Sequence, residues 1–243
     1  MIPRLRYLLL STAIVLVGCG SHAGQKQEEY VLPDQVKDFK TLYGANCAGC
    51  HGQNGRYGAA RPLNDSLYLA LIGKGRLREV IAKGIPNTTM APFAQDAGGT
   101  LTDQQIRILA DQIMARWSSQ SSTAALPPYS AQDAEADGLE PGNAKRGEEA
   151  FRRYCASCHG VDGTGRLGTP GGSAVDPAYL ALVSNQSLRT TVIDGRSDEG
   201  IPDWRDYIHK QPMKPQEISD VVAWLAAQRK LQTYAAKGEM NLK

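Results

Sequence analysis

The sequence predicts an all-α protein made of two similar halves in tandem. Three observations predict it: an internal repeat, an apolar stripe at helical spacing, and a five-residue cysteine–histidine motif that occurs twice. At 243 residues the chain has room for two small domains, each with a modest core. Its composition is that of an ordinary globular protein.

Residues 1–18 have the pattern of a signal peptide. Arg4 and Arg6 form a positive n-region, and an apolar run of about ten residues follows. That run is too short to cross a bilayer, which takes ~20 helical residues. It ends in LVGC, which resembles the lipobox of bacterial lipoproteins. The resemblance implies cleavage before Cys19 and lipid on its sulfur; an uncleaved anchor, or a secreted protein with a chance cysteine, stays open.

The mature chain is therefore expected outside the cytoplasmic membrane, held by lipid, with residues 19–30 as a tether. Without the signal peptide, basic and acidic side chains balance at 25 each. A balanced surface gives no long-range attraction to nucleic acid, and the sequence holds no basic run. We expect a membrane partner through the lipid and no nucleic-acid partner.

Four of the five cysteines form two Cys-x-x-Cys pairs, each followed directly by a histidine. This is the attachment pattern of c-type haem. Residues three apart share one helix face, so two thiols can bond the vinyl groups of one porphyrin edge while the imidazole reaches the iron. The sequence predicts two haem c groups, held by Cys47, Cys50 and His51 and by Cys155, Cys158 and His159.

Two other readings of the cysteine pairs are weaker. One zinc site would have to join pairs more than a hundred residues apart and would leave both histidines unexplained. A thioredoxin-like dithiol would need a βαβ surround, which the sequence does not predict.

Both halves resemble class I cytochrome c domains, and the chain from about 31 to 230 resembles a dihaem c-type cytochrome lipoprotein. The resemblance implies a first helix leading into each motif, a loop with an axial methionine, and a last helix packed across the first. We expect the first half over 31–117, a flexible linker over 118–142, the second half over 143–230 and a tail over 231–243.

The repeat supports this division. Residues 67–93 align with 178–204 without a gap, every pair 111 positions apart, and the tetrapeptide YLAL occurs in both. Copies of this length fit whole domains rather than solenoid units. Residues 118–142 are rich in Ser, Ala, Pro and acidic residues without apolar periodicity, as linkers are.

Several helices can be placed. Asn143 is a plausible N-cap for a helix that runs into the second motif. Gly147 matches the small residue that lets the last helix approach in the resembled family, whereas the first half has Phe39 there. The last helices are expected over 102–117 and 215–230. The second carries an apolar stripe at helical spacing, formed by Ile218, Val221, Val222 and Leu225.

The halves differ at the expected axial methionine. Met90 lies in a proline-containing loop after His51, where the resembled family has its sixth iron ligand. The alignment places Ile201 opposite Met90, and isoleucine cannot bind iron. Met213 and His209 follow as possible ligands, with Met213 preferred, although Met213 also fits a hydrophobic staple before the last helix. Water or no ligand stays open.

The leading functional hypothesis is electron transfer by a membrane-anchored dihaem cytochrome, not an enzyme. The resemblance implies a quinol-oxidising complex with a Rieske centre as donor, or as the complex to which the chain belongs, and a terminal oxidase as acceptor. The alternative is a peroxidase-like enzyme or small-ligand sensor with an open second haem. Its distal groups would come from the polar loop that holds Asp203, Arg205, Asp206 and His209.

Overall fold

The computed structural model describes residues 30–240 except 87, 119–125 and 170, with side chains described as far as 229. The chain divides after Leu32, and the helices lie in the unit that begins at Pro33. The described residues form helices and no strand beyond two isolated β-bridges, so the predicted all-α class is confirmed. The lipobox cysteine, Cys19, lies outside the described residues.

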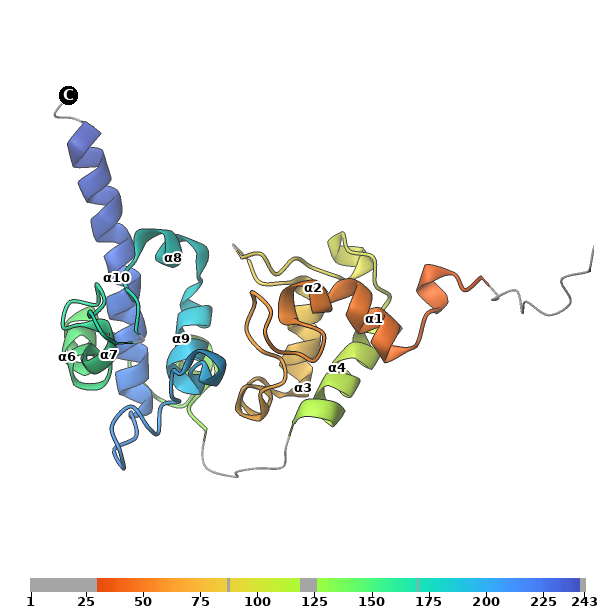
Figure 1. The fold of residues 1–243 in the computed structure, drawn as a ribbon, viewed down its shortest axis with the longest axis horizontal. Coiled ribbons are helices and arrows are strands. Elements are labelled where there is room, and N and C mark those ends of the chain that lie inside the picture. Colours follow the sequence, from red (N-terminus) through yellow and green to blue (C-terminus); the bar gives the residue numbers. More distant parts are fainter. Residues whose placement is uncertain (1–29, 87, 119–125, 170, 241–243) are drawn as a thin grey trace, which may run out of the picture. The chain divides into compact units, whose positions relative to one another are not determined.

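Figure 1 shows the helices in chain order. Those of the first half are α1 (Phe39–Asn46), α2 (Ala48–His51), α3 (Ser66–Lys83) and α4 (Asp103–Trp117). Those that follow are α5 (Ala131–Ala136), α6 (Ala144–Tyr154), α7 (Ala156–His159), α8 (Pro177–Leu182), α9 (Asn185–Asp194) and α10 (Pro215–Met240). Short 3₁₀ turns cover Pro33–Gln35, Gln95–Ala97 and Ser197–Glu199.

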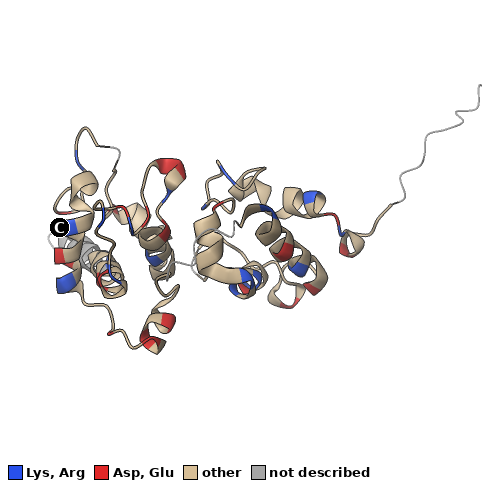
Figure 2. Cartoon of the chain, turned by 90° about the horizontal axis from the view of Figure 1, so that it is seen from below, with Lys and Arg blue, Asp and Glu red and all other residues tan. Residues whose placement is uncertain are grey.

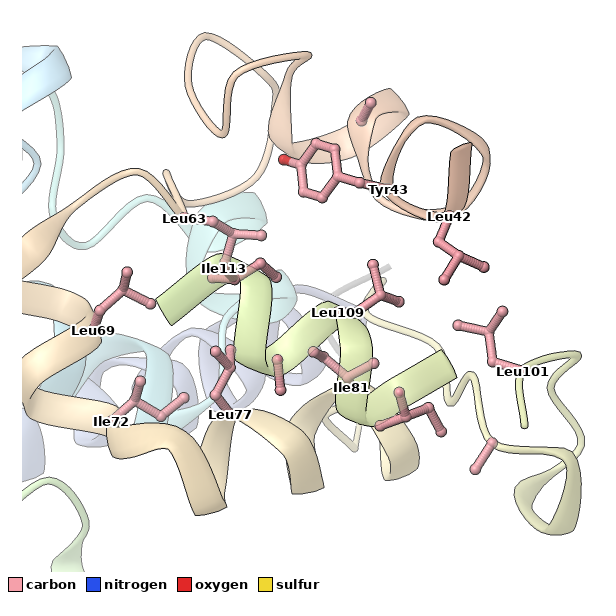
Figure 3. Packing of buried hydrophobic residues seen from close by; sticks show 14 of the residues in the cluster. Leu42, Tyr43, Leu63, Leu69, Ile72, Leu77, Ile81, Leu101, Leu109 and Ile113 are labelled. Carbon is pink, nitrogen blue, oxygen red and sulfur yellow. The ribbon is translucent and has the colours of Figure 1, made fainter. Parts of the chain in front are cut away.

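The core of the first half lies between α3 and α4 and extends to α1 (Figure 3). Its fully buried side chains come from both helices and include Leu69, Leu77, Ile106, Leu109 and Ile113. The last helix begins where the sequence predicts. Thr102 caps it in a capping box with Gln105, which satisfies two of its free N–H groups.

The second half is built on the packing of α6 against α10. Asn143 caps α6 as predicted, accepting from the N–H groups of Lys145 and Arg146. Gly147 allows close approach, because a Cβ there would overlap the carbonyl oxygen of Asp220 on α10. One helical turn further along α6, the Phe151 ring lies 4.3 Å from that of Trp224. The predicted role of Gly147 is therefore confirmed.

Two segments for which the sequence predicts no helix contain one. The expected linker contains α5, which begins in a capping box of Ser130 and Asp133, and its Ala134 is buried. The last helix continues through the expected tail to Met240. The signal for α5 was the Ser-x-x-Asp pattern, which follows a proline pair and is easily taken for loop.

The charged side chains are distributed as the balanced composition predicts. Acidic and basic residues are interspersed along the helices and loops of both halves (Figure 2). Within the part of the chain that the structure describes, no helix combines the length and the apolar character that a membrane crossing requires.

Candidate haem sites

Each cysteine–histidine motif forms a short turn at the end of a helix. The N–H of Cys47 donates to the carbonyl of Tyr43 at 2.8 Å, and that of His51 donates to Cys47 at 2.9 Å. The second motif repeats both bonds, from Cys155 and His159, at 2.8 and 3.0 Å. In each half one continuous run of backbone hydrogen bonds fixes both cysteines and the histidine together.

A backbone carbonyl orients each histidine. His51 Nδ1 lies 2.8 Å from the oxygen of Arg61, and His159 Nδ1 lies 2.6 Å from that of Gly172. Because a carbonyl only accepts, Nδ1 must carry the proton and donate it. This leaves Nε2 with a free lone pair, the state in which neutral imidazole binds a metal. Burial lowers the pKa of His51, against the smaller opposite effect of its carbonyl bond, and keeps the ring neutral.

The four thiols are free, and two of them are hard to ionise. Burial, with a smaller contribution from the neighbouring cysteine of the motif, raises the pKa of Cys47 and of Cys155 to about 12. Redox-active Cys-x-x-Cys pairs have the opposite property, a lowered thiol pKa. Within the described ranges no group of three or more Cys, His, Asp or Glu could hold a metal ion. The dithiol and zinc readings therefore gain no support.

A hydrogen-bonded loop fixes Met90. Gly84 ends α3 with φ +68°, and a Cβ there would overlap the carbonyl of Met90. The Met90 carbonyl accepts from Ile85 at 2.9 Å, and the N–H of Phe93 bonds back to Ala82 at 3.2 Å. The loop thus closes against the end of α3 and holds Met90 in one place.

The second half repeats the two backbone bonds that close this loop, 111 positions later. Gly195 has φ +71°. The carbonyl of Ile201 accepts from Arg196 at 2.9 Å, and the N–H of Trp204 bonds back to Ile193 at 3.0 Å. Ile201 therefore occupies the backbone position that Met90 occupies in the first half.

Ile201 and the second motif line one cavity of about 330 Å³. Such a volume lies at the lower end of the range for cofactor sites, ~300–1,000 Å³. Its wall joins Cys155, Cys158 and His159 to apolar and aromatic side chains of three helices, among them Phe151, Leu188, Val192, Val221 and Leu225. Free thiols, an oriented imidazole and an apolar wall are what a haem attached through this motif requires, so the residues fit the group.

The structure gives no support to Met213 or His209 as the sixth ligand. Neither is among the described residues that line the cavity. Met213 is 2% exposed and packs with Ile218 in the core, while its N–H donates to the carbonyl of Trp204 at 2.9 Å. This is the predicted hydrophobic staple, and it accounts for the methionine completely. His209 is exposed.

The polar groups of the cavity are not the ones that sequence reasoning chose. None of the four chosen polar residues is among its described lining, and Arg205 pairs with Asp203 at 2.6 Å instead. The lining contains Arg196 and Glu199, whose ion pair measures 2.6 Å, together with three tyrosines, Tyr154, Tyr179 and Tyr207. The repeat could have found Arg196, because it lies in the aligned loop five residues before Ile201.

The family model for the cbb3-type cytochrome c oxidase subunit III matches this chain twice, over residues 34–113 and 142–225. The two matches together cover more than half of the chain. The chain therefore belongs to this family. Two haem c groups, one in each matched region, fit this family and the two-region architecture of the chain.

The chain is also similar to individual oxidase subunits. It is 28% identical over 159 residues to the cbb3-type cytochrome c oxidase subunit FixP of Sinorhizobium medicae, covering 59% of this chain and 47% of the relative. It is 25% identical over 212 residues to FixP of Bradyrhizobium diazoefficiens, covering 83% of this chain and 66% of the relative. The chain thus spans roughly half to two thirds of the length of these relatives.

Proposed function

We propose that this chain is a dihaem c-type cytochrome that carries single electrons as part of a respiratory oxidase. One observation carries the proposal: each family-matched region holds a Cys-x-x-Cys-His turn whose imidazole is fixed by a carbonyl through Nδ1. When bound, haem c supplies a one-electron iron couple. The chain supplies attachment, ligation and a largely apolar surround that shields the couple from water.

The residues take the following roles in this proposal. The four motif cysteines, Cys47, Cys50, Cys155 and Cys158, form the thioether links. His51 and His159 would hold the two irons through Nε2. Met90 would supply a further ligand to the first iron, and such ligation raises the reduction potential and closes an iron to other ligands. The cytochrome domains are those expected at 31–117 and 143–230, with the second extended by α10.

The proposed partners follow from the relatives. FixP is named as a subunit of a cbb3-type cytochrome c oxidase, so we infer that the electron acceptor here is a terminal oxidase to which this chain belongs. A quinol-oxidising complex is retained as the donor. A signal peptide and lipid on Cys19 would place the chain outside the cytoplasmic membrane. Residues 19–30 would give a tether of up to ~40 Å at 3.3–3.6 Å per residue.

Haem attachment is tested by counting the covalently bound haems in each chain. The full-length protein, denatured and freed of loose haem, should retain two haems per chain by pyridine haemochrome absorbance and by mass. Replacing both cysteines of either motif by alanine should leave one. Two haems retained in either double variant would refute the assignment of that motif.

The partnership is tested in native membranes. The tagged full-length protein, solubilised gently, should co-purify with the catalytic subunit of a terminal oxidase, and its haems should be oxidised by that complex in air. Repeated purification without any oxidase subunit, from membranes that contain active oxidase, would count decisively against the proposed acceptor.

A further inference from the structure

The second half reproduces the ligand loop of the first half and lacks its ligand. The carbonyls of Met90 and Ile201 each accept a backbone hydrogen bond of 2.9 Å from the residue five positions earlier. The side chain of Met90, however, ends in a thioether, whereas that of Ile201 is a branched hydrocarbon. A hydrocarbon cannot coordinate iron. Because Ile201 lines the same cavity as His159, the wall where a sixth ligand belongs has no donor atom at this position.

Other groups of the cavity are engaged elsewhere. Among its described lining residues, Tyr207 donates its hydroxyl to the carbonyl of Val192 at 3.0 Å, and Glu199 is ion-paired with Arg196. Tyr154, a third group of the lining, donates its hydroxyl to a carboxylate oxygen of Glu217 at 3.1 Å. These three side chains are therefore already engaged by other groups of the protein.

We propose that the second half binds a small neutral diatomic molecule, such as carbon monoxide, nitric oxide or dioxygen, at the haem iron that Ile201 leaves open. This inference rests on the proposed attachment of haem to Cys155 and Cys158. It adds to electron transfer a ligand site that the first half, closed by Met90, does not have.

The charges of the wall favour a neutral ligand. Arg196 is the one permanently positive side chain among the described lining residues. Its guanidinium is already held by Asp198 at 2.9 Å and by Glu199 at 2.6 Å, so two carboxylates surround one cation. Pairing with Arg196 lowers the pKa of Asp198 and keeps it ionised. An anion entering here would meet net negative charge, whereas a diatomic molecule without charge meets an apolar wall.

Carbon monoxide is the probe. The full-length protein, first shown to hold two covalent haems, is reduced with dithionite and titrated with carbon monoxide in the Soret band. We expect one carbon monoxide for every two haems. In Ile201→Met the bound fraction at the wild-type midpoint should fall at least tenfold. The spectrum before addition should also change from part high-spin to fully low-spin.

Two further variants serve as controls. Leu180→Met adds a methionine to the same half at a buried position outside the cavity, and should leave carbon monoxide binding as it is. Met90→Ile copies the second loop into the first and should raise the stoichiometry to two. If two haems are attached and none binds carbon monoxide, or if Ile201→Met binds as the wild type does, the inference is overturned. If only one haem is attached, it is the proposed function that fails.

Discussion

Met90 and Ile201 occupy the same position in two loops that are closed by the same two backbone hydrogen bonds. The two side chains differ in the property that matters for a haem: methionine has a thioether sulfur that can bind iron, and isoleucine has no such atom. In the proposed first site the thioether would saturate the iron, so that an electron could enter and leave with little change in coordination. In the proposed second site the isoleucine would leave the iron without this bond.

Met213 gives the next prediction at this scale. Because it is a packing residue at the start of α10, Met213→Leu should lower the free energy of unfolding by less than ~1.5 kcal/mol. Met213→Ala should lower it by ~2–5 kcal/mol. Neither should alter the Soret and visible bands of the folded protein. Urea unfolding and absorbance together check this, with Met90→Leu as the variant whose spectrum must change. A shifted spectrum in Met213→Leu would restore Met213 as a ligand.

The charge of Glu199 gives a second prediction at the residue scale. If the two carboxylates around Arg196 repel anions, Glu199→Gln should increase azide binding to the oxidised protein by ~2- to 5-fold, as expected for one partly exposed charge. Carbon monoxide binding to the reduced protein should not change. Asp111→Asn removes an exposed charge in the first half, from α4, and serves as the control for net charge. Equal azide affinity in all three proteins would disprove the electrostatic part of the inference.

At the scale of elements, the helices that lead into and out of the sites were predictable because capping residues in the sequence mark where they begin. Asn143 and Thr102 cap α6 and α4 as expected. The helix α5 was missed because its capping pattern lies in a stretch of linker-like composition. The end of α10 was missed because its last part has no strong apolar stripe and no stop signal before residue 238.

The site was predictable only in part, for a related reason. A motif specifies residues that are adjacent in sequence, so the cysteines and histidines could be identified at once. The residues that line the cavity around Ile201 come from several helices, and only the fold brings them together. A methionine near the expected loop has two explanations, ligand or packing residue, and only the fold shows that Met213 lies in the core and outside the lining of the cavity.

The crossing of α6 and α10 provides a prediction at this scale. Gly147→Ala would push a methyl group into the backbone of α10 at Asp220, and should destabilise the protein by ~1–3 kcal/mol, as overpacking does. Gly44→Ala is the matched control, because a Cβ in that position of α1 meets nothing within 4 Å. It should stabilise by ~0.5–1 kcal/mol through helix propensity. Thermal and urea unfolding measure both; equal effects would contradict the close packing.

At the scale of the whole molecule, the chain combines two haem units with an N-terminal segment that the sequence predicts to be lipidated. Cys19→Ser should therefore move the protein from the membrane fraction to the soluble fraction after expression in a host that processes lipoproteins. The neighbouring Ser21→Ala should leave it in the membrane fraction. Fractionation with detection of covalent haem after gel electrophoresis checks both. A Cys19→Ser protein that stays wholly in the membrane fraction would rule out the lipid as its anchor.

The two halves also imply two different haems in one molecule, and this is the central claim. Methionine ligation raises a haem's potential, and a haem without it is expected to differ in both potential and spin state. The most direct measurement is resonance Raman spectroscopy of the reduced full-length protein without added ligand. We predict equal amounts of six-coordinate low-spin and five-coordinate high-spin haem. Two six-coordinate low-spin haems would contradict the account.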